Sequence, residues 1–266
     1  MDPIPGLAAT VTIKTHDPER DLVSRFIHEQ RVWEPFETRL WVACHAPDDV
    51  VVDVGANLGY FSILSALAVG ALGRVFAFEP EPLNYSLLEA NLADLEANGL
   101  VEGFRIALGA HESSGKLWLS DDNLGDHQLF SADSARESVP VAVYPGVDVL
   151  SERVDRIDLL KLDTQGTELA VLEGLWPMLL KSRPRLRILI ELTPYSLRQA
   201  GASGAALIER LATLGLPLAI VDHVQHRLVP SSATALCEWC DNVDRDPQDQ
   251  GFMNLFVGAA PRGFQG

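Results

Sequence analysis

The chain has 266 residues, of which 47% are hydrophobic and 22% charged, and its net charge at neutral pH is −16. This composition is typical of a globular protein with a sizeable core, and the length suits one large α/β domain. The acidic balance argues against nucleic acid as a partner, because nucleic-acid binding draws on lysine and arginine. No segment has the about 18 uninterrupted apolar residues of a membrane span and no signal peptide opens the chain, so we expect a cytoplasmic protein.

After an N-terminal arm, residues 1–32, apolar runs alternate with helical patterns through most of the chain. Such alternation predicts parallel strands joined by right-handed helical crossovers, with ligands at the carboxyl ends of the strands. The predicted helices are 34–45, 58–69, 83–97, 167–175 and about 194–214, and the predicted strands are 50–54, 75–78, 104–108, 157–162, 187–192, 218–221 and 252–257.

The most informative pattern is a β-branched strand that contains Asp53 and leads to Gly55 and Gly59. The next strand ends at Glu79, so two neighbouring strand ends carry acids. Two such acids indicate a ligand with an amine at one place and ribose hydroxyls at another, since a carboxylate accepts charge-assisted hydrogen bonds. A dinucleotide site favours a G-x-G-x-x-G turn and no acid that repels its pyrophosphate. Asn57 suits a strained turn beside such a ligand.

Regularity lapses over about 110–146, where strand-like pieces at 116–119 and 139–143 flank a polar, glycine-containing segment. Long irregular insertions in compact domains are usually functional, so we expect a lid-like insertion. Within it, Asp126 stands beside His127, where the carboxylate could orient the imidazole or raise its pKa. We predict His127 as a general base, the alternative being an ordinary histidine in a solvated loop.

Five motifs occur in a fixed order: WEPFET at 33–38, DVGANLGY at 53–60, AFEP at 77–80, LKLDTQGTE at 160–168 and LIEL at 189–192. In this order they resemble the FkbM-type family of class I methyltransferases, which bind S-adenosylmethionine. The resemblance covers roughly residues 33–257. It implies a Rossmann-like α/β sandwich over 33–266, with a mostly parallel seven-stranded sheet, helices on both faces and an antiparallel final strand.

The resemblance also implies an enzyme that moves the methyl of S-adenosylmethionine to an oxygen of a small molecule or glycan by in-line displacement. N-methylation is one alternative, and a non-catalytic S-adenosylmethionine-binding sensor or scaffold is another. The residues expected to contact the cofactor are Asp53, Gly55, Asn57, Gly59, Glu79, Pro80 and Ala107, with Glu34 and Thr38 placed there by the family likeness. The residues expected to serve the chemistry are His127, Asp126, Asp163 and Glu191.

Two observations concern metals. Gln165 stands where many relatives have Glu, so we expect no required divalent ion, because a neutral amide is a poor ligand for a hard cation. His223 and His226 precede Cys237 and Cys240, a spacing conceivable for zinc. Positions i and i+3 on a strand point to opposite faces, however, and ordinary packing or solvent exposure is the favoured interpretation of these four residues. The sequence carries no signal for the oligomeric state.

Overall fold

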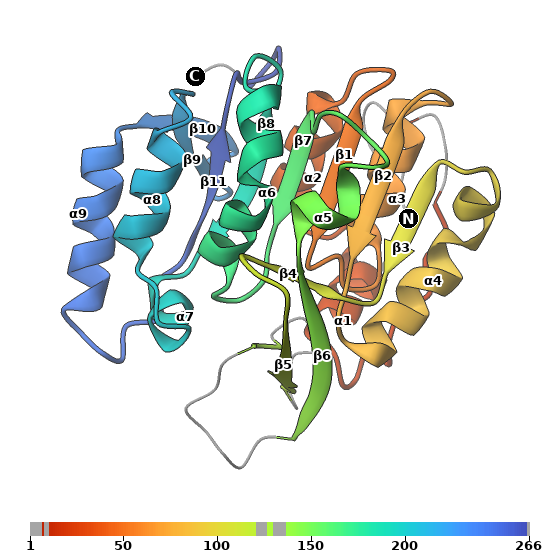
Figure 1. The fold of residues 1–266 in the computed structure, drawn as a ribbon, viewed down its shortest axis with the longest axis horizontal. Helices are drawn as coiled ribbons and strands as arrows, with labels where there is room; N and C mark the ends of the chain where they lie inside the picture. The colour runs from red at the N-terminus through yellow and green to blue at the C-terminus, as the bar shows by residue number, and fades with distance from the viewer. Residues whose placement is uncertain (1–6, 8–10, 121–126, 130–136, 265–266) are drawn as a thin grey trace.

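The protein is described by a computed structural model that covers residues 7, 11–120, 127–129 and 137–264. Within these residues one large sheet runs through the centre, between two layers of helices (Figure 1). In spatial order its eight strands are β10 (Arg227–Ser231), β9 (Leu218–Asp222), β11 (Met253–Val257), β8 (Arg187–Leu192), β7 (Leu159–Leu162), β1 (Val50–Val54), β2 (Arg74–Phe78) and β3 (Val101–Phe104).

The strand directions confirm the predicted fold class. β1, β2, β3, β7 and β8 are mutually parallel, and the final strand β11 is antiparallel to both β8 and β9. The prediction of seven strands was wrong by one, because β10 pairs antiparallel with β9 at the edge of the sheet. β10 contains Pro230, which lacks an N–H for pairing and is tolerated on an edge strand.

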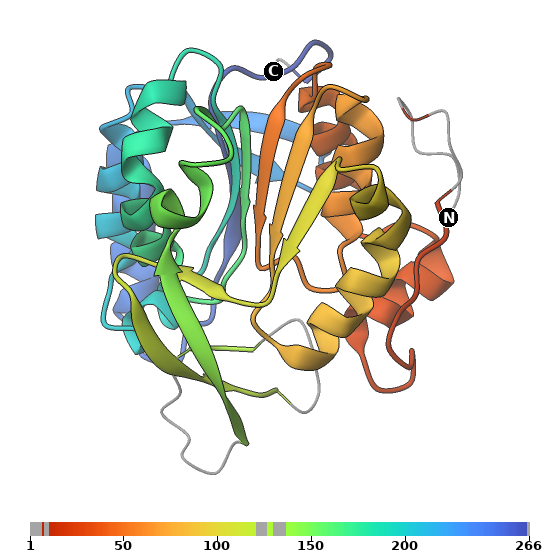
Figure 2. The same cartoon turned by 45° about the vertical axis from the view of Figure 1, so that its right-hand side comes forward.

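Helices cover both faces of the sheet, as the turned view shows (Figure 2). Alternate residues of β1 face different layers, with Val52 in one buried cluster and Val51 in the other. None of the helices in the described ranges is long and apolar enough to cross a membrane. The Val51 side is packed by α1 (Leu22–Gln30), α2 (Pro35–Cys44), α3 (Tyr60–Val69) and α4 (Pro82–Ala97), and the Val52 side by α5 (Gly146–Leu150), α6 (Glu168–Ser182), α7 (Pro194–Gln199), α8 (Gly204–Ala212) and α9 (Ala233–Asp244).

The strand predicted over 104–108 is divided between two sheets. β3 ends at Phe104 in the large sheet, whereas β4 (Ala107–Gly109) pairs with β6 (Ser138–Pro145) in a second sheet. β5 (Ser113–Trp118) completes this second sheet by pairing antiparallel with β6. An apolar run looks like one strand locally, but its two halves pair with different strands, β3 with β2 and β4 with β6, and these distant partners decide where the run divides. Figure 1 shows β5 and β6 projecting beyond the carboxyl ends of the parallel strands.

Candidate active site

A cavity of about 790 Å³ lies at the carboxyl ends of the parallel strands, within the size range of small-molecule sites. Its walls come from the ends of β1, β2, β7 and β8, from α1, and from β4 and β5 of the second sheet. The predicted site residues that line it are Glu34, Asp53, Gly55, Asn57, Glu79, Pro80, Ala107, His127, Asp163 and Glu191.

Two other predicted residues, Thr38 and Gly59, are absent from the described lining of this cavity. Thr38 is fully buried, and its hydroxyl donates to the Trp33 carbonyl at 2.6 Å and lies 3.2 Å from the Tyr60 hydroxyl. Gly59 precedes α3 with φ +87°, a conformation that favours glycine. Thr38 and Gly59 therefore lie behind the cavity wall, and their neighbours Trp33 and Tyr60 are among the residues that line the cavity. Asp126 lies outside the described residues.

The turn after β1 approaches β7 very closely at Gly55. A Cβ at this position would lie 1.8 Å from the carbonyl oxygen of Asp163, and Gly55 has φ +79°. Only glycine is compatible with both conditions. Asn57 follows with φ +51°, which is the strained turn conformation expected from the sequence.

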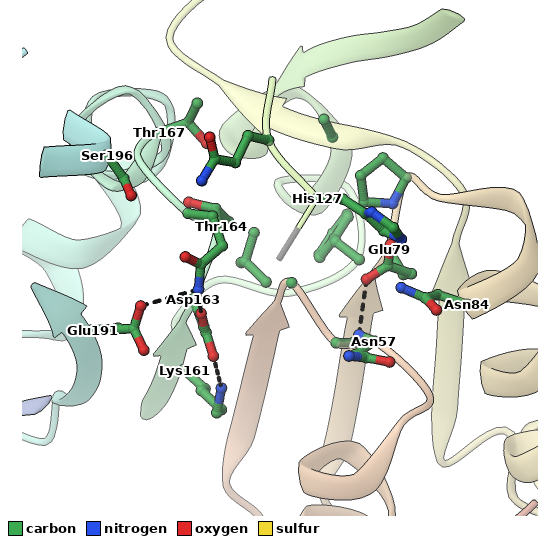
Figure 3. Close-up of a pocket in the computed structure, with 18 of the residues that line it drawn as sticks. Asn57, Glu79, Asn84, His127, Lys161, Asp163, Thr164, Thr167, Glu191 and Ser196 are labelled. Carbon is green, nitrogen blue, oxygen red and sulfur yellow. Dashed lines mark hydrogen bonds and ion pairs between the residues drawn. The ribbon is translucent and has the colours of Figure 1, made fainter. Parts of the chain in front are cut away.

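Glu79 is buried and rigidly held. Its Oε2 accepts the backbone N–H of Asn57 at 2.8 Å (Figure 3). Its Oε1 accepts the backbone N–H of Glu81 at 2.9 Å. Burial raises the pKa of Glu79 to about 7, although these two hydrogen bonds oppose the rise. Because each carboxylate oxygen has a further lone pair, both can still accept a hydroxyl.

Two buried acceptors of the cavity wall lack a hydrogen-bond donor among the described groups. They are Oδ1 of Asp53 and Oδ1 of Asn57. The other oxygen of Asp53 accepts the Ser62 hydroxyl at 2.6 Å, and burial raises the pKa of this carboxyl. Since leaving a buried acceptor unpaired is costly, the pair fits a ligand that brings N–H or O–H donors.

Lys161 is a site residue that the sequence analysis missed. It is the register partner of Asp53, and its Nζ lies 3.1 Å from Oδ2 of Asp163 and 4.7 Å from the centre of the Phe61 ring. Burial lowers the pKa of its ammonium, but nearby carboxylates outweigh this and hold the pKa above its usual value. These carboxylates are Asp163, Asp53 and Glu34. A lysine between leucines in a buried strand was the available signal, because a buried ammonium needs anionic partners.

Asp163 and Glu191 are joined by the side chain of Gln165. The Gln165 amide nitrogen donates to Asp163 Oδ1 at 2.9 Å and to Glu191 Oε1 at 3.0 Å. Burial, together with the neighbouring carboxylates, raises the pKa of Glu191 to about 8. The same cause, burial, raises the pKa of Glu34 to about 7, although Lys161 opposes this rise. The carboxylates that act on Glu191 are Asp163, Glu168 and Glu34.

His127 lines the cavity, and its ring contacts the backbone of Ser120. Its Nδ1 accepts the backbone N–H of Ser120 at 3.0 Å, so a neutral imidazole in this arrangement carries its proton on Nε2 and acts there as a donor. His127 also lies on the Glu79 side of the cavity, away from Asp163 and Glu191 (Figure 3). Of the acids with which His127 was expected to act, Asp163 and Glu191 lie across the cavity, and Asp126 lies outside the described residues.

The histidines and cysteines considered for zinc lie in different surroundings. His226 stacks on Phe36, a member of the cluster on the Val51 side of the sheet. Cys240 is buried in the cluster on the opposite face, against Gly204 of α8. Within the described ranges, no group of three or more His, Cys, Asp or Glu side chains is arranged to hold a metal ion.

Comparison with known proteins agrees with this geometry. Residues 53–216 match the family model of the methyltransferase FkbM domain. Methyltransferase 1 of Beauveria bassiana is 27% identical over 60% of this chain and 70% of its own length. The 31-O-demethyl-FK506 methyltransferase FkbM of Streptomyces tacrolimicus is 29% identical over 49% of this chain and 62% of its length. Hexuronic acid methyltransferase AglP of Haloferax volcanii is 31% identical over 48% of this chain and 50% of its own length.

The fold is the mostly parallel α/β sandwich that the sequence predicts for a class I methyltransferase. Within that class the chain belongs to the FkbM methyltransferase family, whose model covers more than half of it. The prediction of the family, and with it of an enzyme, is confirmed. The chain spans less than two thirds of the length of the Streptomyces and Haloferax relatives.

Proposed function

We propose that this protein transfers the methyl group of S-adenosylmethionine to a hydroxyl of a small molecule or glycan. The observation that carries the proposal is the division of one cavity into two polar ends. Glu79 is fixed by two backbone amides at one end. At the other end Glu191 is linked through Gln165 to Asp163, which pairs with Lys161. The first end suits a ribose, and the second suits the removal of a proton.

The residues present fit the cofactor. Glu79 would accept the ribose hydroxyls with the lone pairs that its backbone bonds leave over. The unpaired Oδ1 of Asp53 would accept from the methionyl ammonium, and Glu34 adds negative charge on the same side. Pro80 and Ala107 offer apolar contacts for the adenine. When bound, S-adenosylmethionine supplies a methyl group on a positively charged sulfur.

At the other end, Glu191 would take the proton of the acceptor hydroxyl. Asp163 is less suited to this task, because Gln165 and Lys161 occupy both of its oxygens. A raised pKa matches a base that works near neutral pH, and a positioned base contributes typically ~10²–10⁴-fold to the rate. Alignment of donor and acceptor by the cavity walls would supply the rest. His127 and Leu117 bring the 110–146 insertion to this cavity, which supports a lid role for it.

The names of two relatives support an oxygen acceptor. The Streptomyces relative acts on an O-demethyl compound and the Haloferax relative on a hexuronic acid. We therefore expect a hydroxyl of a metabolite or sugar as the acceptor here. Nucleic acid is not expected as a substrate, given the net charge of −16.

Two experiments test the proposal. Calorimetry measures the binding of S-adenosylhomocysteine, and the protein is then incubated with S-adenosylmethionine and a panel of hydroxyl-bearing sugars, uronic acids and polyketides. We expect binding of S-adenosylhomocysteine and, for at least one acceptor, a mass gain of one methyl for one hydrogen. Absence of binding would overturn the proposal. Binding together with methylation of amines only would move the reaction to nitrogen, and binding without transfer to any acceptor would favour a cofactor-binding module.

A further inference from the structure

The amide of Gln165 uses both of its N–H donors on carboxylates of two different strands. One goes to Asp163, just after β7, and the other to Glu191 near the end of β8. If the amide were turned over, its oxygen would face both carboxylates and be repelled by each. The orientation of the Gln165 side chain is therefore fixed by its surroundings.

The backbone at this point supports a specific role for the side chain. Gln165 has φ +54°, in the left-handed region that side-chain-bearing residues rarely adopt. The next residue, Gly166, has φ +114°, and a Cβ there would lie 2.5 Å from the carbonyl oxygen of Ser196. Such strain persists only where the surroundings hold it, and it concentrates at functional sites. The turn thus presents the Gln165 amide to the two acids.

The contacts of Glu191 distinguish its two oxygens. Oε1 accepts both the Gln165 amide and the Thr193 hydroxyl, the latter at 3.1 Å. With two donors directed at Oε1, a proton on this carboxyl belongs on Oε2. We propose that Gln165 is a positioning residue for the methyl transfer, which holds Oε1 of Glu191 so that Oε2 alone exchanges the acceptor's proton. This inference rests on the proposed function, because the reaction supplies the proton.

The charges around Glu191 make this control effective. Three carboxylates, at the end of β7, on α6 and at the residue before α2, repel the charged form of Glu191. One ammonium on β7 neutralises part of their charge. A neutral donor at position 165 stabilises the charged form of Glu191 without adding another charge. The groups concerned are Asp163, Glu168, Glu34 and Lys161.

A carboxyl titration tests the inference without a known acceptor. The glutamate side-chain carboxyls are labelled with ¹³C, and the signal of Glu191 is assigned by its loss in Glu191→Gln. Gln165→Met keeps the length of the side chain and removes both donors, so we expect the pKa of Glu191 to rise by about one unit or more. Gln165→Glu, which adds a charge instead, should raise it at least as far. Gln225→Met, in an exposed turn, is the matched control and should leave it unchanged.

Calorimetry with S-adenosylhomocysteine on the same proteins separates this inference from the proposed function. We expect both Gln165 variants to keep its affinity within about threefold, because Glu79 and Asn57 are intact, and to lose roughly tenfold or more of turnover once an acceptor is known. An unchanged Glu191 titration in either folded variant that still binds S-adenosylhomocysteine would overturn the inference alone. A wild-type protein that does not bind it would overturn the proposed function, whatever the titration shows.

Discussion

The carboxylate of Glu79 accepts the backbone N–H of Asn57 at 2.8 Å, and Asn57 itself is held in the left-handed region at φ +51°. This bond ties the end of β2 to the turn after β1. The carboxylate is thereby oriented by backbone donors, because the N–H of Glu81 binds its other oxygen at 2.9 Å. Preorganisation of this kind reduces the entropy that a ligand loses on binding.

Replacement of Glu79 by Ala should therefore weaken the binding of S-adenosylhomocysteine at least tenfold. The variant loses two charge-assisted acceptors, each of which contributes roughly 1.5–3 kcal/mol. Calorimetry measures the change, with circular dichroism to establish folding. Glu102→Ala is a suitable control, because Glu102 is a half-exposed carboxylate that pairs with Arg153 on the surface. Equal affinity of the folded Glu79→Ala variant and the control would contradict the assignment of the ribose site.

A comparison of His127→Ala with Glu191→Gln should identify the base. Because Nδ1 of His127 accepts a backbone N–H, we expect its loss to lower turnover by less than about tenfold, whereas loss of Glu191 lowers it ~10²-fold or more. Initial rates with the acceptor found by the panel, measured against pH, give both numbers. A large loss in His127→Ala, together with disappearance of a rate limb near the usual histidine pKa, would return the role of base to His127.

Divalent ions should not be required for turnover. The amide of Gln165 already joins Asp163 to Glu191, and Lys161 neutralises part of their charge. Treatment with a chelator such as EDTA should therefore leave the rate within about twofold, since no charged oxygen is available at position 165 to attract a hard cation. A rate that falls in chelator and recovers with added magnesium would show that this expectation is wrong.

The stability of the ligand-free protein should fall as the pH rises from roughly 6.5 to 8.5. Glu191, with a pKa of about 8, and Glu79, with a pKa of about 7, bind protons in the folded state that the unfolded chain has already released. His45 acts in the opposite direction at the lower end of this window: burial lowers its pKa from 6.5 to about 4, so the unfolded chain still releases part of a proton above pH 6.5, which adds about 0.4 kcal/mol of stability by pH 7.5. In Glu191→Gln the decline should be shallower, by up to about 1.4 kcal/mol per pH unit. Urea denaturation at several pH values across this range gives the free energy of unfolding of both proteins. Equal pH dependence of this free energy in the wild-type protein and in Glu191→Gln would refute the expectation.

Local sequence was sufficient to predict most of the residues that line the Glu79 end of the cavity. A β-branched strand, Gly55 in the following turn and Glu79 after the next strand are close in sequence, and each can be recognised from its neighbours alone. The parallel arrangement of consecutive strands then brings their carboxyl ends to one edge of the sheet. Thr38 and Gly59 belong to the same motifs but lie behind the wall, because a motif does not specify which of its side chains faces the cavity.

The sequence by itself determined the order of strands and helices, the family and the acids at the strand ends, because each strand, helix and motif is recognised from residues close together in the chain. Tertiary structure decided which side of the cavity His127 takes, where the 104–109 segment divides between two sheets, and how Lys161 and Gln165 link the acids. The physical reason is that these features are pairings between groups far apart in the chain. Burial, charge and hydrogen-bond satisfaction select such partners only after the sheet has assembled.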